Sequence, residues 1–536
     1  MIQEELVIIG AGPAGLSAAL EAARNGLHPV VYDENARPGG QLFKQAHKFF
    51  GSKEHRASER GFRIGEQLLQ EAGELGVRVQ LQSTVLGIYE HRILNVLRNN
   101  QIERVKAGSL IIATGASENG LSFPGWTLPG VMGVGAAQTL ANLHGVTPGR
   151  RILMVGAGNV GLVAGLQMMQ AGAELVAVVE GGPTVGGYGV HASKLARAGV
   201  PFYTRHTVVE AQGSQSVTGA VIAEVDSHWK PIPGTERHLD VDTILLAVGL
   251  SPMSQLARMA GCQMVNRGGW VPQVGECNAT SVPGIYAAGD VSGIEEASSA
   301  MLQGALSGLA AARHLGYVDD DTFTSRREQL GKNLHQLREG LEAAKQATRP
   351  QFASKPESNS TPSLPMSLLS NGYLSEEEVR GLPGVPFPIA SRTRAMATIE
   401  CAQEIPCNPC MTACPHDAIT IENGISGLPR LDPEKCTGCG KCLSLCPGQA
   451  IFLVDDRPES DECHISLPYE FALPEKGEEV VALDRSGAAL GPARVHRVRL
   501  NKSMDATAVV TIAVPREWAQ KARYFRRLAV AAVKVA

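Results

Sequence analysis

The sequence predicts an α/β fold followed by a small cysteine-rich domain, and three observations carry this prediction. Across residues 1–340, apolar runs typical of buried strands alternate with Ala- and Leu-rich helical segments, as in doubly wound α/β folds. A glycine-rich motif occurs twice in that block, near residue 10 and near residue 156. Eight cysteines crowd between residues 401 and 446. This is a metal-cluster pattern rather than a disulfide framework.

Length, charge and hydropathy argue against several classes of protein. A chain of 536 residues has a prior of three or four domains at about 150 residues each. The 49 basic and 53 acidic residues give a net charge of -4, which argues against a large nucleic-acid footprint. The sequence holds no run of 18 apolar residues, so we expect no membrane span. The N-terminus carries Glu4 and Glu5 and lacks the basic region of a signal peptide, so we expect a cytoplasmic protein.

The first glycine motif has the surroundings of a dinucleotide site. An apolar strand leads into Gly10-Ala11-Gly12-Pro13-Ala14-Gly15, and a helical stretch follows. Gly10 allows a tight turn, Gly12 lets a pyrophosphate approach the backbone, and Gly15 lets the helix pack on the strand. The second strand ends at Asp33, which can accept hydrogen bonds from ribose hydroxyls. We expect dinucleotide binding here; the alternative is a glycine-rich turn without a ligand.

The second motif repeats this pattern. The run Gly156-Ala157-Gly158-Asn159-Val160-Gly161 follows a strand, and the next strand ends at Glu180. A carboxylate favours a ribose diol over a 2′-phosphate, and no Arg or Lys follows Glu180 closely, so NAD is preferred over NADP. Another adenine nucleotide that never reacts, or a structural relic, is the alternative. The expected nucleotide-binding residues are Gly156, Gly158, Asn159, Val160, Gly161 and Glu180.

Three further segments indicate which dinucleotide the first site binds. They are Arg37-Pro38-Gly39-Gly40-Gln41, Ile111-Ile112-Ala113-Thr114-Gly115 and Gly284-Ile285-Tyr286-Ala287-Ala288-Gly289-Asp290. With them, residues 1–320 resemble the two-dinucleotide flavoprotein family that includes thioredoxin reductase. The resemblance implies Rossmann-like domains and FAD in the first of them, with Asp290 near the ribityl and pyrophosphate groups. The FAD-binding residues that it implies are Gly10, Gly12, Pro13, Ala14, Gly15, Asp33, Gly40, Gln41, Thr114, Gly115, Gly289 and Asp290.

One feature departs from the disulfide reductases of that family, which carry a redox Cys-x-x-Cys. This sequence has no cysteine before Cys262, and Cys277 follows 15 residues later. We therefore expect no thiol–disulfide exchange, and we interpret both residues as packing cysteines. His47, His55 and His191 are isolated histidines for which surface or core roles are expected. The catalytic residues stay unknown.

The cysteine block consists of two similar runs. Cys436-x2-Cys439-x2-Cys442-x3-Cys446-Pro447 has the spacing that binds one 4Fe–4S cluster with three cysteines and lends the fourth to a neighbouring cluster. A near copy with a longer first gap is Cys401-x5-Cys407-x2-Cys410-x3-Cys414-Pro415. Zinc is the alternative, and such proline-ended runs are a poor zinc-finger spacing. The repeat resembles two-cluster bacterial ferredoxins over residues 396–456.

The ferredoxin resemblance implies two 4Fe–4S clusters and their ligands. One cluster would take Cys436, Cys439, Cys442 and Cys414, and the other Cys407, Cys410, Cys446 and Cys401. The five-residue gap after Cys401 departs from the ferredoxin pattern, so spacing alone does not support this ligand. Cys463 is expected to be free.

Composition also predicts where the domains end. Residues 346–372 are rich in Pro and Ser and lack periodicity, which indicates a linker. A helix is expected over residues 324–346, a short one starting at Ser375 with Glu378 in a capping box, and a basic one around residues 523–527. The expected domains are an FAD-binding domain (1–118 and 253–345), an NAD-type domain (119–252), a linker (346–395), a ferredoxin-like α+β domain (396–456) and a β-rich C-terminal appendage (457–536).

A closer resemblance bears on function. The Arg37–Gln41 run and the stretch 288–294 with Gln303-Gly304 resemble the alpha subunits of heteromeric amine and amino-acid dehydrogenases. These include sarcosine oxidase, opine oxidase, hydrogen cyanide synthase and dye-linked proline dehydrogenase. The resemblance implies an electron-transferring subunit that works with a partner FAD subunit, on which an amino acid, amine or hydroxy acid is oxidised. The dicluster insert replaces the smaller iron–sulfur module of those subunits, which leaves the substrate class open.

Two other functions remain open at the level of sequence. One is a self-sufficient NADH:acceptor oxidoreductase that passes electrons through FAD and the clusters to ferredoxin or another carrier. The other is a non-catalytic scaffold with structural cofactors, which the combination of a flavin site and two clusters disfavours. The sequence does not give the substrate, the direction of electron flow, the terminal acceptor or the oligomeric state.

Overall fold

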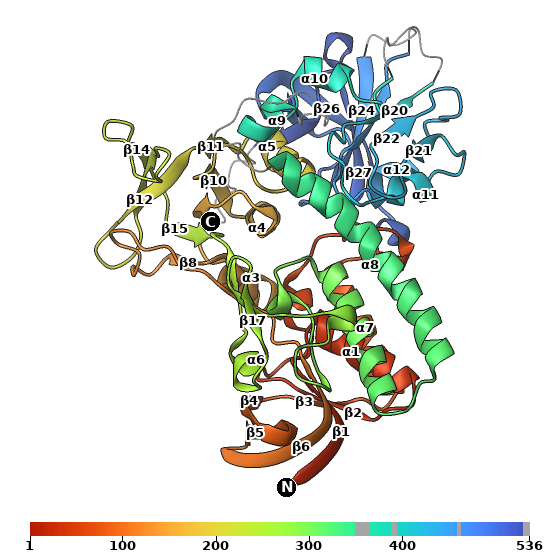
Figure 1. Cartoon of the computed structure of the whole chain (residues 1–536). Coiled ribbons are helices and arrows are strands. Elements are labelled where there is room, and N and C mark those ends of the chain that lie inside the picture. Colours follow the sequence, from red (N-terminus) through yellow and green to blue (C-terminus); the bar gives the residue numbers. More distant parts are fainter. Residues whose placement is uncertain (349–364, 387–393, 458–461, 529–536) are drawn as a thin grey trace, which may run out of the picture. The chain divides into compact units, whose positions relative to one another are not determined.

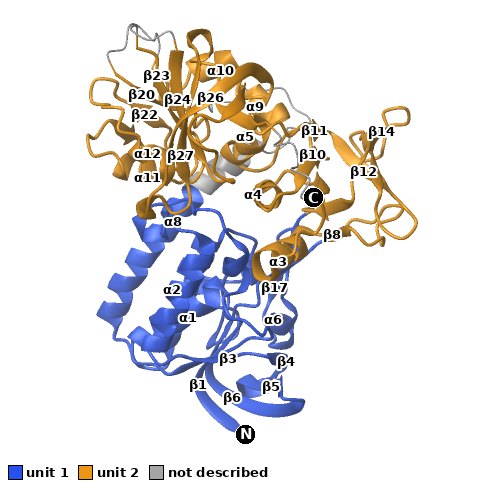
Figure 2. Ribbon diagram, turned by 180° about the vertical axis from the view of Figure 1, so that it is seen from behind, with its two compact units in different colours: residues 1–119, 249–339 blue, residues 120–248, 340–536 orange. Residues whose placement is uncertain are grey.

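The computed structural model describes residues 1–348, 365–386, 394–457 and 462–528 (Figure 1). The chain divides into two compact units, one of residues 1–119 with 249–339 and one of residues 120–248 with 340–536 (Figure 2). Both contain the α/β layers that the sequence predicts, and the fold class is confirmed. The residues of the Pro/Ser-rich stretch from 349 to 364 lie outside the described part.

A seven-stranded sheet forms the centre of the first unit. Its order is β3-β2-β1-β6-β5-β4, with β19 paired to the end of β6. The pairs among β1, β2, β3, β6 and β19 are parallel, whereas β4 and β5 pair antiparallel. The strands are β1 (Ile2–Ile9), β2 (Pro29–Tyr32), β3 (Arg78–Gln80), β4 (Ser83–Tyr89), β5 (Ile93–Arg98), β6 (Gln101–Ile112) and β19 (Ile285–Ala287). The carboxyl ends of five parallel strands thereby lie at one edge of the sheet.

Helix α1 (Pro13–Arg24) packs closely on α7 (Ala297–His314) in this unit. A Cβ atom added at Gly304 would lie 2.0 Å from the carbonyl oxygen of Ala14, and one at Gly308 would lie 2.2 Å from that of Ala18. Glycine is therefore required at both positions. The other helices are α2 (Gly61–Glu74), α6 (Gln255–Met259) and α8 (Asp320–Thr348), whose last nine residues are assigned to the second unit. Helix α8 confirms the helix predicted over residues 324–346. Two short antiparallel pairs are β7 (Ala116–Glu118) with β16 (Leu250–Pro252) and β17 (Met264–Asn266) with β18 (Trp270–Pro272).

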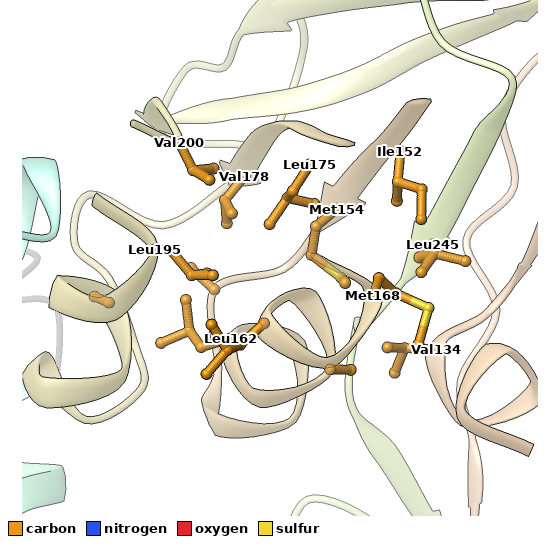
Figure 3. Close-up of a cluster of buried hydrophobic side chains, with 14 of the residues drawn as sticks. Val134, Ile152, Met154, Leu162, Met168, Leu175, Val178, Leu195, Val200 and Leu245 are labelled. Atoms are coloured by element: carbon orange, nitrogen blue, oxygen red, sulfur yellow. The ribbon is translucent and has the colours of Figure 1, made fainter. Parts of the chain in front are cut away.

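The second unit begins with a parallel sheet in the order β11-β10-β9-β15-β8, joined by an antiparallel sheet of β12, β13 and β14. Buried apolar side chains from this sheet and from the neighbouring helices form the core shown in Figure 3. Strands and helices are β8 (Val131–Gly133), α3 (Val134–His144), β9 (Arg151–Val155), α4 (Asn159–Gln170), β10 (Glu174–Glu180), α5 (Gly189–Arg197), β11 (Phe202–Thr204), β12 (His206–Gln212), β13 (Gly219–Glu224), β14 (Arg237–Leu239) and β15 (Thr243–Leu246).

Two short helices lie within the range predicted as a linker. They are α9 (Met366–Asn371) and α10 (Glu376–Arg380), and their apolar side chains share a small buried cluster. The amide of Glu378 donates to Oγ of Ser375 at 3.3 Å, and the amide of Ser375 donates to Oε2 of Glu378 at 2.8 Å. The predicted capping box is thus confirmed.

The cysteine-rich region has the element order of two repeated halves. Its elements are β20 (Met396–Ile399), α11 (Pro409–Thr412), β21 (Ile419–Ile421), β22 (Pro429–Leu431), α12 (Lys441–Leu445) and β23 (Ile451–Asp455). Strand β20 pairs with β23, and β21 pairs with β22, both antiparallel. Each cysteine run is followed by its proline and then by a strand, so the sequence repeat is also a structural repeat.

The C-terminal strands continue the sheet of the cysteine-rich region. One seven-stranded sheet has the order β20-β23-β24-β27-β26-β25-β28. The added strands are β24 (Glu462–Tyr469), β25 (Glu479–Leu483), β26 (Ala489–Arg499), β27 (Ala508–Pro515) and β28 (Tyr524–Arg527). The predicted basic helix at residues 523–527 is wrong, because this segment pairs with β25 and buries Phe525 in the sheet core. Pairing and burial outweigh local propensity here.

A buried ion cluster joins the two ends of this sheet. Glu400, which follows β20, accepts hydrogen bonds from Arg485 at 2.6 and 2.9 Å and from Arg523 at 2.5 Å. All three residues are buried. Burial alone would raise the pKa of Glu400, but the two guanidinium groups outweigh it and hold that pKa at about 2. The carboxylate is therefore ionised at neutral pH and fully paired.

Replacement of Glu400 by Gln should lower the free energy of unfolding at pH 7 by about 3–5 kcal/mol, because it leaves buried guanidinium groups uncompensated. The wild-type advantage is present above a pH of about 4.5 and should disappear as the pH falls toward 2, where the folded-state carboxylate takes up a proton. Urea unfolding at pH 7 and at pH 3 measures both effects. Glu462→Gln, which breaks an exposed ion pair with Arg494, is the control. Losses of equal size in the two variants would contradict the expectation.

Candidate functional site

The first candidate site lies at the sheet edge of the first unit. In the register of the parallel strands, Ile9 of β1 lies opposite Tyr32 of β2 and Ile112 of β6, and Ala287 of β19 lies opposite Ile112. The segments that follow these strands therefore meet at one edge. Parallel α/β sheets bind their ligands at this edge. Four of the predicted FAD segments leave the sheet here.

The glycine loop after β1 leaves open space in front of a helix N-terminus. Gly10 has a φ of 104°, and its added Cβ would lie 2.4 Å from the carbonyl oxygen of Ala113. An added Cβ at Gly15 would lie 1.8 Å from the carbonyl oxygen of Gly10. At Gly12, the N-cap of α1, an added Cβ would meet nothing within 4 Å. The turn and the packing thus require two glycines, and the third leaves room for an anion at the positive end of the helix.

Asp33 fixes the position of this loop. Its Oδ2 accepts a hydrogen bond from the amide of Ala11 at 2.7 Å, and its Oδ1 accepts from the amide and the side chain of Asn35 at 2.8 Å each. The carboxylate is buried. It therefore holds the glycine loop at the end of β2, and any ribose hydroxyl would share these oxygens.

The Gly39-Gly40 turn lies against the same loop. The amide of Gly39 donates to the carbonyl oxygen of Ala11 at 2.8 Å, and a Cβ added at Gly40 would lie 2.9 Å from Cα of Gly12. Gly40 is thus required for this close approach. Gln41 is exposed, whereas Ala14 is buried beneath α7.

The segments after β6 and β19 complete this edge. Thr114 donates its hydroxyl to the carbonyl oxygen of Met253 at 2.7 Å, and the amide of Met253 donates to the carbonyl of Gly115. The hydroxyl of Thr114 thus fixes a neighbouring segment of the chain. After β19, the amide of Gly289 donates to Oε1 of Gln303 at 2.7 Å. Gln303 belongs to the Gln303-Gly304 motif of the sequence and is buried. Its hydrogen bond to Gly289 holds the turn that carries Asp290.

Asp290 is a carboxylate in an unfavourable place for its charge. Burial raises the pKa of Asp290 to about 6; the Glu295 carboxylate adds to the rise, and a hydrogen bond from the amide of Glu295 opposes it. A ligand that donates hydroxyl groups to this carboxylate would favour its ionised form. The donor-rich ribityl chain of a flavin fits that requirement.

The second glycine loop repeats the geometry of the first. Gly156 has a φ of 106°, and its added Cβ would lie 2.3 Å from the carbonyl oxygen of Ala247. An added Cβ at Gly161 would lie 2.3 Å from the carbonyl oxygen of Gly156, and one at Gly158 would meet nothing within 4 Å. Glu180 accepts from the amides of Ala157 at 2.9 Å and Gly182 at 2.8 Å, as Asp33 accepts from Ala11 and Asn35. The two loops are structural copies.

The other predicted residues of the second loop have distinct surroundings. Oδ1 of Asn159 accepts a hydrogen bond from the amide of Tyr188 at 2.7 Å, which ties the N-terminus of α4 to the loop before α5. Val160 is 45 % exposed in the first turn of α4. Gly187 approaches the glycine loop as Gly40 does in the first unit, since its added Cβ would lie 2.9 Å from the amide nitrogen of Asn159.

Two residues near Glu180 were missed in the sequence because they come from later segments of the chain. Arg205 lies in the turn between β11 and β12, and Trp229 lies in the loop between β13 and β14. The ring of Trp229, which is 60 % exposed, lies against Gly181, where an added Cβ would be 2.2 Å from the indole. The amide of Arg205 donates to the carbonyl oxygen of Gly182 at 2.8 Å. An aromatic ring thus reaches the loop after Glu180 from a segment that no local pattern near Glu180 reveals.

The cysteines form two groups in the second unit. A pocket is lined by Cys414 of the first run together with Cys436, Cys439 and Cys442 of the second. This is the exchange of a fourth cysteine between runs that a dicluster site requires. Burial raises the pKa of Cys442 to about 12, and the neighbouring thiols add to the rise. These four residues fit the donor set of one 4Fe–4S cluster.

Cys446 packs against the same hydrophobic cluster as Cys401 and Cys410 of the first run. Burial raises the pKa of Cys401 to about 12, and the charge of Cys446 adds to the rise. The pKa of Cys410 is raised well above its ordinary value by burial, and then by Cys446 and Cys401. The long gap that follows Cys401 in the sequence thus does not keep it away from the hydrophobic cluster on which Cys410 and Cys446 also pack. Cys407, the remaining member of the predicted set, is half-buried. No three His, Cys, Asp or Glu side chains in the described ranges are grouped to hold a single metal ion.

The remaining cysteines and histidines lie elsewhere. Cys262 and Cys277 are buried in the first unit, where burial raises both pKa values, that of Cys277 to about 11. Cys463 is buried in the C-terminal sheet. His55 accepts or donates within a capping box, and His191 stacks on Tyr188.

Comparison with known proteins identifies the family. The model of the pyridine nucleotide-disulphide oxidoreductases matches residues 4–304. The chain belongs to this family. A second match, to the 4Fe–4S dicluster domain, covers residues 405–450. The family predicted from the glycine motifs is confirmed, and the protein is a flavoprotein oxidoreductase with a 4Fe–4S dicluster region.

Curated relatives of this oxidoreductase are named as subunits. The hydrogen cyanide synthase subunit HcnB of Pseudomonas aeruginosa is 30 % identical over 334 residues, which are 57 % of this chain and 70 % of that protein. An opine oxidase subunit from Agrobacterium tumefaciens is 28 % identical over 60 % of this chain and 68 % of its own length. Among solved structures, thioredoxin reductase of T. acidophilum has a TM-score of 0.49 at 22 % identity and covers 58 % of this chain and 99 % of its own.

Within the described residues, the oxidoreductase has no helix that is both long and apolar enough to span a membrane.

The raised pKa of Asp290 predicts that the stability of the folded protein depends on pH. Because the folded protein binds this proton more tightly than the unfolded chain, the stability of the flavin-free protein should fall as the pH rises from about 4 through 6. Asp290→Asn should remove this fall and gain about 1–3 kcal/mol over the wild type at pH 8. Urea unfolding at pH 5 and pH 8 measures the difference, and FAD affinity should weaken in the same variant. Parallel pH profiles of the two proteins would show that Asp290 is not responsible.

Proposed function

We propose that this oxidoreductase is the FAD- and iron–sulfur-containing electron-transfer subunit of a multi-subunit dehydrogenase. A partner flavoprotein subunit would oxidise an amino acid, amine or hydroxy acid. The observation that carries the proposal is the presence, in one chain, of an open glycine cradle at a parallel sheet edge and of two groups of cysteines. Relatives named as subunits of hydrogen cyanide synthase and opine oxidase support it.

FAD would bind to the first unit. When bound, the flavin accepts an electron pair and releases electrons singly. The residues of the chain would position it: the amides at the start of α1 face the pyrophosphate across Gly12, Asp33 accepts from the adenosine ribose, and Asp290 accepts from the ribityl hydroxyls. Gly40, Gln41, Gly115 and Gly289 would border the same cradle. Cysteine chemistry is not part of this proposal, since the first cysteine of the chain is Cys262, buried in the core.

Two 4Fe–4S clusters would bind to the cysteine-rich region. Cys414, Cys436, Cys439 and Cys442 would hold one, and Cys401, Cys407, Cys410 and Cys446 would hold the other. Each cluster carries one electron at a time, which suits a relay between a two-electron flavin and a one-electron carrier such as ferredoxin. Soft thiolates are the ligands that iron–sulfur clusters prefer.

A second candidate function rests on the second glycine loop. This loop copies the first in its turn, its packing glycine and its open position at Gly158. NAD(H) or another adenine nucleotide would bind there, with Glu180 accepting from the ribose diol. If the nucleotide is NADH and it reduces the flavin, the chain is a self-sufficient NADH:acceptor oxidoreductase.

One anaerobic titration separates the two functions. The isolated chain, loaded with about eight iron atoms and one FAD, is mixed with NADH and followed by flavin absorbance. An electron-transfer subunit should keep its flavin oxidised and should purify gently with a stoichiometric partner. Rapid bleaching by NADH without a partner would favour the self-sufficient enzyme. An iron content of about four atoms would remove one cluster from either scheme.

Matched substitutions test the two nucleotide sites. Gly12 and Gly158 both have extended backbone that any residue adopts, and a Cβ meets no protein atom at either. Gly12→Val should therefore fold, keep its iron and lose FAD, whereas Gly158→Val should keep FAD and lose the second nucleotide. Flavin absorbance and calorimetry with NAD(H), NADP(H) and ADP measure the outcome. Stoichiometric flavin in Gly12→Val would show that FAD binds elsewhere.

A further inference from the structure

Two buried cations from the nucleotide-binding domain reach the cysteine-rich region. Lys194 and Arg197 lie one turn apart on α5, and both are 5 % exposed. Nζ of Lys194 donates to the carbonyl oxygen of Pro447 at 2.7 Å, and Nη2 of Arg197 donates to that of Gln449 at 3.1 Å. Both carbonyls belong to the turn that directly follows Cys446.

Close packing fixes α5 against this turn. An added Cβ at Gly448 would lie 3.0 Å from the side chain of Val190, so the helix and the turn approach each other closely. At the start of α5, the amide of Gly189 donates to Oε1 of Gln403 at 2.9 Å. Gln403 is buried, and in the sequence it lies between Cys401 and Cys407. Helix α5 thus contacts both segments that would supply ligands to the same cluster.

Several buried cations gather at this place around one buried carboxylate. The guanidinium groups of Arg197 and Arg523 lie 5.1 and 5.3 Å from the centre of the Phe452 ring. Arg485 also lies in this cluster, and Glu400 is the buried carboxylate that faces it. Burial lowers the pKa of Arg197 only to about 10, so Arg197 is charged at neutral pH.

A buried positive charge affects the reduction potential of a nearby group that accepts electrons. Reduction of a 4Fe–4S cluster adds one negative charge, and the potential of a cluster depends on the charges and hydrogen bonds around its sulfurs. A buried cation acts through a low dielectric, so it stabilises the reduced form more than an exposed cation does. We propose that Lys194 and Arg197 raise the reduction potential of the cluster held by Cys401, Cys407, Cys410 and Cys446. This rests on the cluster assignment under the proposed function.

The surroundings of the other cysteine group provide an internal comparison. Its pocket is lined by Lys441, which is exposed, and Arg499 lies beside Gly440 at its rim. Neither residue is on α5. Loss of charge at Lys194 or Arg197 should therefore change the potential of one cluster much more than that of the other.

The test is a redox titration of the full chain, followed by electron paramagnetic resonance. The two couples are assigned with Cys407→Ser and Cys439→Ser, each of which perturbs one cluster. In Lys194→Met and Arg197→Met, the ratio of reduced to oxidised Cys446 cluster at a fixed potential should fall roughly tenfold, which is about 59 mV for one electron. Lys194→Arg and Arg197→Lys keep the charge and should restore most of the potential. Lys435→Met removes an exposed cation and should have little effect on that couple.

The outcomes are distinct. Two couples of unchanged potential in the methionine variants would overturn the role of Lys194 and Arg197, while the cluster assignment would stand. Absence of a second couple in the wild type would instead refute the assignment itself. If the methionine variants lose iron, Lys194→Gln and Arg197→Gln keep a donor for the carbonyl without the charge, and the same tenfold shift is expected. Equal shifts of both couples would also contradict the proposal.

Discussion

A carboxylate at the end of a parallel strand holds each glycine loop in place, and both candidate nucleotide sites depend on it. Asp33 accepts from the amide of Ala11, and Glu180 accepts from the amide of Ala157. Each bond ties the residue between the first two glycines of the loop to the end of the neighbouring strand. The same oxygen atoms are those expected to accept from a ribose. Structural support and ligand recognition therefore use one group, and a substitution there affects both.

The sequence predicted this region well because its signals are local. The three glycines of each loop lie within six residues; the turn and the packing require the first and the third, and the middle one leaves open space. The capping box at Ser375 and Glu378 is equally local. In contrast, Gln303 acts on Gly289 from another helix, and Trp229 reaches Gly181 from a hairpin 48 residues later. Contacts of this kind depend on tertiary structure, which a single sequence does not display.

The same distinction explains what was wrong or missing in the C-terminal region. Basic residues around Arg526 suggested a helix, but a strand partner in β25 and the burial of Phe525 decide the conformation. The pairing of Glu400 with Arg485 and Arg523 spans more than 80 residues. Charge pairs at such separation leave no pattern in the sequence. The spacing after Cys401 likewise gave no support for this ligand, although the fold packs Cys401 and Cys446 against one hydrophobic cluster.

The continuous sheet from β20 to β28 has a consequence for biogenesis. Glu400 precedes the first cysteine of the block, yet one of its two partners, Arg523, belongs to a segment synthesised more than 120 residues later. Until that segment leaves the ribosome, the carboxylate beside Cys401 lacks half of its compensation. The cysteine-rich region is therefore not a detachable ferredoxin module. The buried ion cluster beside Cys401 is complete only after the chain has been synthesised almost to its last strand, β28.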